Sequence, residues 1–237
     1  MMQGESKNSN IFIDQAIELM RKNVFTAQNV EDESNTIVFG AFETTANTIG
    51  YVLILLVMFP EYQQKVYEEL LTIFPDEGDF DVTYANIQEM TYMDMVINEY
   101  MRVLTPVPFV GRENSHDIEL SNGIVVPGGV QFLINIFTLH RRKDLWGPNA
   151  DMFDPDHFLP CNMEDKHPYA FIPFTKGIRN SIGWKYGLMS TKITLAKLLR
   201  NFKFSTDFQY ADLEFTYSIV LKLKHIPVLR VEIDKYG

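Results

Sequence analysis

Apolar residues recur every three or four positions along several stretches of the chain, a spacing typical of amphipathic helices. Residues 11–22 carry one such stripe, and Pro60 ends one helix and opens the next. A short helix is predicted around residues 83–90, followed by longer ones over 91–102 and 188–202. The pattern therefore predicts a body built mainly of helices.

The longest segment with almost no charge covers residues 36–59, where Glu43 is the one acidic residue. Its length makes it a candidate membrane span, because about 20 apolar residues cross a bilayer. Polar residues near its middle and the short purely apolar part, residues 49–59, argue against that. We predict a fully buried central helix instead.

Strand patterns are shorter and lie in the second half of the chain. Residues 117–120 and 124–126 flank the turn Ser121–Gly123 and predict a hairpin, and a strand is predicted at 130–134. Residues 215–224 and 227–233 predict a terminal β pair. A long ordered meander rich in proline and aspartate is predicted over 145–171. The fold class is therefore mainly α (α+β), helix-rich with small β-sheets.

Composition narrows the classes of function. The formal net charge is −10 and no basic stripe interleaves with aromatics, which disfavours nucleic acid as the main partner. The single cysteine, Cys161, excludes an internal disulfide and fits a reducing compartment. The five histidines show no metal-ligand spacing, so a zinc site is not expected.

The most informative segment is residues 171–183, FIPFTKGIRNSIG. The spacing of Phe174, Gly177, Arg179, position 181 and Gly183 resembles the heme-binding loop of the cytochrome P450 superfamily, the heme-thiolate monooxygenases. In that family the residue at position 181 is the cysteine whose thiolate binds the heme iron. This chain has Ser181, a neutral hydroxyl and a weak donor, in that place.

Two further segments, in the right order, support the resemblance. Glu99 and Arg102 lie three apart on a predicted helix and can form an ion pair on one face. They resemble the family's E-x-x-R pair, although an ordinary surface pair has the same spacing. Residues 153–158, FDPDHF, resemble the family's F-x-P-E-R-F segment, with His157 in place of its arginine. The resemblance implies that Glu99, Arg102 and His157 are structural.

The resemblance extends into the long uncharged segment. Residues 40–45, GAFETT, are similar to the family's A-G-x-[DE]-T-T segment above the oxygen-binding face of heme. It implies that Ala41 leaves room beside the heme and that Glu43 and Thr44 relay protons as catalytic residues. A buried threonine bonded to the previous turn is the structural alternative.

The remaining implied site residues surround the heme. Arg112 and Arg179 align with arginines that bind heme propionates, for which a guanidinium fork is suited. Phe174, Gly177 and Gly183 belong to the heme loop. The implied substrate-lining residues are Phe42, Val107, Phe109 and Val110, with residues 217–220 as a further candidate. Any core strand would show the same apolar character.

As a whole, the resemblance implies a heme- and O2-dependent monooxygenase that oxidises a lipophilic small molecule. Electrons would come from NADPH through a flavoprotein reductase docked near Lys176 and Lys185, at the cytosolic face of the endoplasmic reticulum membrane. Residues 10–237 would be the carboxy-terminal part of one such domain, without its amino-terminal half or membrane anchor. Residues 1–9 would be a disordered or non-native start.

Ser181 sets a limit on that expectation, because serine cannot supply an anionic sulfur donor. Two alternatives follow. The chain could be a non-catalytic relic or a heme-binding module of the same fold, or a single-span membrane protein built on its long apolar helix.

Overall fold

The computed structural model describes residues 11–76 and 78–233 of the 237. The chain divides into two compact units, Met1–Glu43 and Thr44–Gly237, and the helix α2 runs through the boundary. The predicted disordered or non-native start at residues 1–9 lies outside the described residues.

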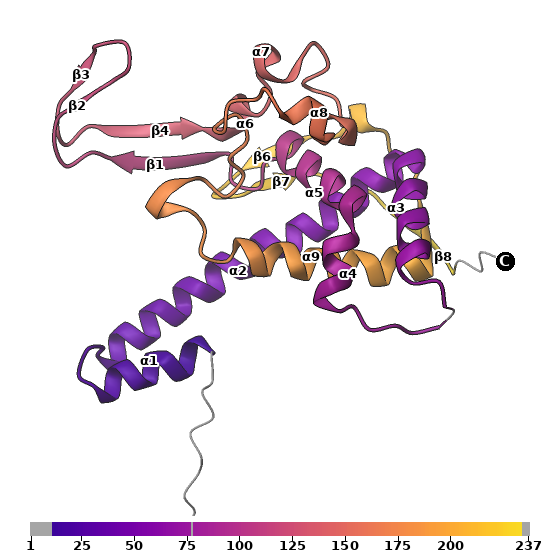
Figure 1. The fold of residues 1–237 in the computed structure, drawn as a ribbon, viewed down its shortest axis with the longest axis horizontal. Helices are drawn as coiled ribbons and strands as arrows, with labels where there is room; N and C mark the ends of the chain where they lie inside the picture. Colours follow the sequence, from indigo (N-terminus) through magenta and orange to yellow (C-terminus); the bar gives the residue numbers. More distant parts are fainter. Residues whose placement is uncertain (1–10, 77, 234–237) are drawn as a thin grey trace, which may run out of the picture. The chain divides into compact units, whose positions relative to one another are not determined.

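Helices dominate the structure, as the apolar periodicity predicts, and short 3-10 turns fill several connections (Figure 1). The α-helices are α1 (Phe12–Arg21), α2 (Ala27–Met58), α3 (Pro60–Ile73), α4 (Tyr84–Glu89), α5 (Thr91–Val103), α6 (Ile136–Leu139), α7 (Lys143–Trp146), α8 (Pro160–Met163) and α9 (Trp184–Asn201). The 3-10 turns are η1 (Pro155–Phe158), η2 (Gly177–Arg179) and η3 (Tyr210–Asp212). The predicted meander therefore contains α8 and η1 and is ordered.

Local chemistry fixes several of the helix starts. Pro60 is the first residue of α3, where its missing N–H costs no hydrogen bond. Thr83 caps α4 through a reciprocal pair of bonds with Asn86. The carboxylate of Glu69 on α3 accepts the first backbone N–H groups of α5, at 2.6 Å from Tyr92 and 3.0 Å from Met93. The Glu69 cap thereby ties the start of α5 to α3.

Over residues 11–76 and 78–233, the strands form four separate two-stranded antiparallel sheets. They pair β1 (Phe109–Glu113) with β4 (Gln131–Asn135), β2 (Ile118–Glu119) with β3 (Val125–Val126), β5 (Phe202–Ser205) with β8 (Arg230–Ile233), and β6 (Phe215–Tyr217) with β7 (Leu221–Leu223). The predicted hairpin is β2–β3, at the end of the long β1–β4 ribbon (Figure 1). The mainly α class with small sheets is confirmed.

The predicted terminal β pair is wrong in its partners. Residues 215–223 form their own hairpin, β6–β7, and β8 pairs with β5, which directly follows α9. The register of β5 and β8 places Phe204 opposite Val231. The sequence analysis placed strand structure over residues 215–224 and 227–233 but did not identify β5, because the partner of β8 depends on where α9 ends.

The core of the larger unit is built around the second half of α2. Val52, Leu55 and Leu56 are completely buried there, and the ring of Tyr51 packs edge-on against Tyr100 of α5 at 6.4 Å. The Tyr51 hydroxyl accepts the backbone N–H of Leu223, which ties β7 to the same helix. This cluster joins α2, α5 and β7.

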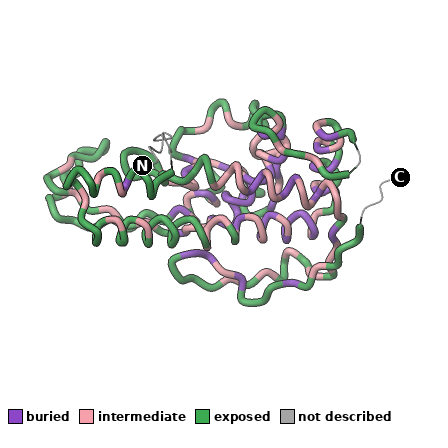
Figure 2. Tube along the Cα trace, turned by 90° about the horizontal axis from the view of Figure 1, so that it is seen from below, coloured by how far each residue is buried: buried purple, intermediate pink, exposed green. Residues whose placement is uncertain are grey.

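The prediction of a fully buried segment over residues 36–59 is wrong for its first part. Val38, Phe39 and Phe42 are each more than 60% exposed, and burial begins at Thr48 (Figure 2). The core partners α5 and β7 meet α2 around Tyr51. The earlier turns of the helix therefore carry apolar side chains that the described residues do not cover.

α2 is long and apolar enough to cross a membrane by length and composition. That test also selects core helices of soluble proteins. The residues from Thr48 to Val57 include seven that are buried in the protein core. Their packing favours the core-helix interpretation over the single-span alternative.

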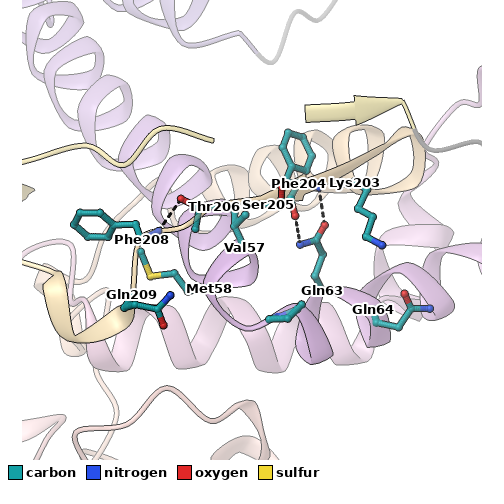
Figure 3. Close-up of a pocket in the computed structure, with 11 residues that line it drawn as sticks. Val57, Met58, Gln63, Gln64, Lys203, Phe204, Ser205, Thr206, Phe208 and Gln209 are labelled. Carbon is teal, nitrogen blue, oxygen red and sulfur yellow. Dashed lines mark hydrogen bonds between the residues drawn. The ribbon is translucent and has the colours of Figure 1, made fainter. Parts of the chain in front are cut away.

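A buried glutamine links α3 to the strand after α9. Gln63 is only 6% exposed; its amide donates to the carbonyl of Phe204 at 3.0 Å and accepts the N–H of Phe204 at 3.0 Å (Figure 3). The same amide donates to Leu56 O at 3.2 Å. Gln63 thus makes the two backbone hydrogen bonds to Phe204 that a neighbouring strand would make. Both residues line a cavity of about 320 Å³.

We expect Gln63→Leu to lower the free energy of unfolding by about 2–4 kcal/mol, because it leaves both backbone groups of Phe204 without a partner. Urea denaturation measures the change. Gln64→Leu is the matched control, since Gln64 is the exposed neighbour and bonds only Glu68 among the described residues. Equal stability of the two variants would contradict this assignment.

Candidate functional site

Residues 171–183 form a closed loop that leads into α9. The Ser181 N–H donates to Phe174 O at 3.0 Å, and the Thr175 hydroxyl donates to Arg179 O at 3.0 Å. Thr175 and Gly177 have φ of 62° and 82°, so the chain turns sharply between them. The bonds bring the first and last parts of the predicted heme loop together.

Ser181 lies three residues before the start of α9, with Gly183 as the N-cap residue. The first N–H groups of a helix favour a negative charge nearby. A thiolate would benefit from that field, whereas a neutral hydroxyl gains little from it. The helix start thus favours an anionic donor at position 181, and this chain does not supply one.

The loop is exposed from Lys176 through Tyr186. Ile178 and Ile182 are 101% and 95% exposed, which is unusual for isoleucine. The Arg179 guanidinium is exposed and makes no hydrogen bond or ion pair with any residue that the structure describes. Both apolar and cationic groups are therefore free on this loop to meet another molecule.

The other predicted propionate ligand, Arg112, lies on β1 and is half-buried, and it donates to Gly111 O at 2.8 Å. No contact joins Arg112 to Arg179 among the described residues. α2 and α9 do approach each other. A Cβ built on Gly187 would lie 3.7 Å from the Thr45 hydroxyl. Thr44, the predicted relay residue, accepts a bond from the Thr48 hydroxyl at its carbonyl.

Two of the predicted substrate-lining segments lie side by side. The ring of Phe109 packs edge-on against Tyr217 at 6.1 Å, and the Leu221 N–H donates to Pro106 O at 3.0 Å. Val107 and Val110 belong to the same stretch, and Phe109 is 39% exposed. The structure thus places residues 106–110 beside residues 217–221. Phe42 lies on the exposed first part of α2, in the other unit.

A completely buried ion pair joins Glu99 and Arg102 on α5. Both side chains have 0% exposure, and two bonds of 2.7 Å join the carboxylate to the guanidinium. The remaining guanidinium N–H groups donate to the carbonyls of His140, Ala150 and Met152. The pair is therefore fully bonded and holds the meander against α5.

His157 joins this pair from η1. Its Nδ1 lies 3.0 Å from Glu99 Oε1, which also accepts the Asp154 N–H at 2.8 Å. Trp146 lies over the Arg102 guanidinium at 5.0 Å and meets the His157 ring edge-on. The three predicted structural residues are therefore in direct contact.

The sequence analysis did not identify His140 as part of this region. Its ring is completely buried, its Nε2 accepts the Ile172 N–H at 2.9 Å, and burial lowers the pKa of the imidazole to about 3. The available signal was a histidine beside two arginines in an otherwise apolar stretch. That signal alone does not distinguish it from the other histidines.

Comparison with known proteins places this geometry in a family. The family model for cytochrome P450 matches residues 2–228. The chain belongs to the cytochrome P450 family. The members of this family are in general heme monooxygenases.

Three relatives from Drosophila melanogaster show how the match is distributed. The chain is 59% identical to probable cytochrome P450 313a4 over 96% of its own length and 46% of the relative. It is 51% identical to probable cytochrome P450 313a3, covering 92% of the chain and 44% of that protein. Cytochrome P450 4c3 is 34% identical, covering 90% and 40%. The chain thus spans about half the length of the curated relatives it matches.

The site fits a heme only in part. The exposed loop offers Arg179 for a propionate, and its apolar side chains are available to a porphyrin. The donor set does not fit a heme-thiolate centre, because the side chain at position 181 ends in a hydroxyl.

We expect Arg102→Ala to lower the free energy of unfolding by about 3–5 kcal/mol, because it leaves the buried Glu99 carboxylate without its counter-charge. Thermal and urea denaturation of the purified chain measure the loss. Arg142→Ala is the control, since Arg142 pairs with Asp144 at the surface and should change stability little. An Arg102 variant as stable as the control would contradict a structural role for the pair.

Proposed function

We propose that this chain is the heme-side, carboxy-terminal part of a cytochrome P450 monooxygenase, and that Ser181 removes its oxygen-activating ligand. The observation that carries the proposal is the closed loop 171–183, which presents position 181 at the start of α9. When bound, heme supplies the iron at which dioxygen is activated. With a hydroxyl at position 181, we expect little or no monooxygenase activity.

The substrate class proposed is a lipophilic small molecule. Support comes from the apolar side chains gathered where residues 106–110 meet residues 217–221. Phe42 and Ala41 on α2 are proposed ligand contacts on the strength of the family resemblance alone. The Glu43 carboxyl and Thr44 hydroxyl are proposed to pass protons toward the oxygen side in a family member with cysteine at position 181.

The second candidate function is a non-catalytic heme-binding module. It is favoured by Ser181, because the rest of the loop closes without the cysteine through backbone and threonine bonds. This candidate shares every proposed contact except the one at position 181. The two candidates therefore predict different results for a Ser181→Cys variant. Monooxygenase activity should return if the first is right and should not return if the second is right.

Replacing Ser181 with cysteine tests these alternatives. We use the chain extended with the amino-terminal portion of the 59% identical relative. The Ser181→Cys variant should bind heme and give the thiolate-type spectrum after reduction and carbon monoxide treatment, and it should oxidise lipophilic substrates. The same extended chain with Ser181 retained should show neither the thiolate-type spectrum nor substrate oxidation.

Ser205→Cys in the extended chain is the matched control, because it adds a thiol on β5, away from the loop. Turnover by the extended chain with Ser181 would show that a hydroxyl or water suffices, and would overturn the proposal. A thiolate spectrum for Ser181→Cys without turnover would favour the binding module.

The proposed partner is an acidic flavoprotein reductase that receives electrons from NADPH. The segment from Lys166 to Thr206 contains eight lysines and arginines and no aspartate or glutamate, in a chain of net charge −10. Lys192 and Lys197 pair with Asp94 and Asp79, and Arg200 donates to Phe74 O and Asp76 O. The cations nearest Ser181 form no such ion pairs among the described residues.

The cations left around the loop are Lys176, Arg179 and Lys185, and their exposed charge would attract an acidic partner. Lys176 lies over the Tyr169 ring at 5.2 Å, and Lys185 lies over the Trp184 ring at 5.4 Å. A reductase of this kind implies the cytosolic face of the endoplasmic reticulum membrane, which we propose as the location.

We expect Lys185→Glu to weaken reductase binding at low salt, with the difference disappearing as salt screens the charges. Surface plasmon resonance across a salt series measures the effect. Lys203→Glu makes the same charge change at the other end of α9, about 25 Å away by helix rise, and should bind normally. Equal losses in both variants would mean that net charge, not this face, governs binding.

A further inference from the structure

His140 connects the buried ion pair to the heme loop. It is the C-cap residue of α6, and its side chain is completely buried. Its backbone carbonyl accepts a bond of 3.0 Å from Arg102. Its ring packs against Phe171, the first residue of the loop, at 5.0 Å between centroids. One residue therefore touches both the α5 ion pair and the start of the loop.

The hydrogen bonds of the ring determine where its proton lies. Nε2 accepts the Ile172 N–H at 2.9 Å, so this nitrogen must carry a lone pair. Nδ1 lies 3.4 Å from Met101 O and 3.3 Å from Thr105 Oγ1, while the Thr105 hydroxyl donates to Arg102 O. Nδ1 therefore carries the proton of a neutral ring.

The bond to Ile172 is the first of a series that reaches Ser181. Ile172 O accepts the Thr175 N–H at 2.9 Å, and the Thr175 hydroxyl reaches Arg179 O at 3.0 Å. The Ser181 N–H then closes the loop on Phe174 O. Beyond Ile172, the loop from Lys176 to Ser181 is exposed, so its path depends on how its first residues are fixed.

We propose that neutral His140 is a positioning residue, which sets the path of the loop bearing position 181 by holding the Ile172 amide to the end of α5. The inference rests on the proposed function only in taking this loop as the one that meets heme. The bond itself needs no heme, and so it can be tested separately.

Burial of the ring and the charges around it favour the same neutral state as its bond with Ile172. Burial is the main cause that lowers the pKa of His140, and the cations Arg102 and Arg141 add to it against the opposing bond with Met101 O. A second ring proton would also place an N–H at Nε2, so that two donors, this group and the Ile172 N–H, would face each other. The folded state therefore holds this ring neutral.

The pH dependence follows from that shift. A histidine in the unfolded chain takes up its proton near pH 6.5, about the ordinary value, whereas the folded ring does so at about 3. The unfolded state thus binds more protons between these values, and the stability associated with His140 is complete above about pH 6.5 and falls as the pH drops toward 3.

Three variants of the 237-residue chain separate the two ends of the ring. In His140→Gln, the side-chain amide can replace Nε2 and accept the Ile172 N–H. In His140→Asn, the shorter amide can replace only Nδ1 and donate toward Met101 O. His140→Phe keeps neither bond. Amide hydrogen exchange is followed at Ile172 and Ser181, with β1 and β4 amides as internal controls. Asn and Phe should speed exchange about tenfold or more, while Gln stays near the unsubstituted chain.

The unsubstituted chain provides a second measurement that does not depend on whether any variant folds. Its long-range proton–nitrogen NMR spectrum should show His140 with Nδ1 protonated and Nε2 unprotonated at pH 7 and still at pH 5. A ring protonated at Nε2 or on both nitrogens would overturn the proposal. Equal exchange in the Gln and Asn variants would also overturn it, because the acceptor would then not matter.

Discussion

The structure depends on one buried ion pair, Glu99 with Arg102. Removing two charges from water is costly, so such a pair is tolerated only when every donor and acceptor is bonded. Here the guanidinium reaches three backbone carbonyls besides the carboxylate, and the carboxylate reaches the Asp154 N–H and His157. The pair therefore holds the segment from His140 to His157, with its short turns α7 and η1, against α5.

That organisation extends to the functional loop. Arg102 holds the His140 carbonyl, the His140 ring holds the Ile172 amide, and the loop closes from Ile172 to Ser181. α9 then begins, and its far end continues into β5, which Gln63 bonds to α3. The later residues of the loop are all exposed, but its start is held by bonds that lead back to the completely buried ion pair.

The departures from the family pattern fall at two places with different consequences. By the resemblance, His157 stands where the family has arginine, and in this structure it reaches Glu99 at 3.0 Å. By the same resemblance, Ser181 stands where the family has cysteine, and the backbone around it closes. Serine keeps the shape of the loop but not the charge and softness of the donor. We therefore propose that the loop keeps its backbone path at position 181 and lacks the donor for heme-thiolate chemistry.

The sequence by itself determined the longer helices, the hairpin β2–β3 and the family, because apolar period, turn residues and motif spacing are local properties. It also paired Glu99 with Arg102 as helical neighbours, and it marked Ser181 as chemically decisive. It did not predict the short helices α6, α7 and α8. Only the tertiary structure decided that β8 pairs with β5, that α2 is exposed before Thr48, and that His140 holds Ile172. These depend on contacts between residues 25 or more positions apart, or on which neighbours cover a helix face. Neither is encoded in a local pattern.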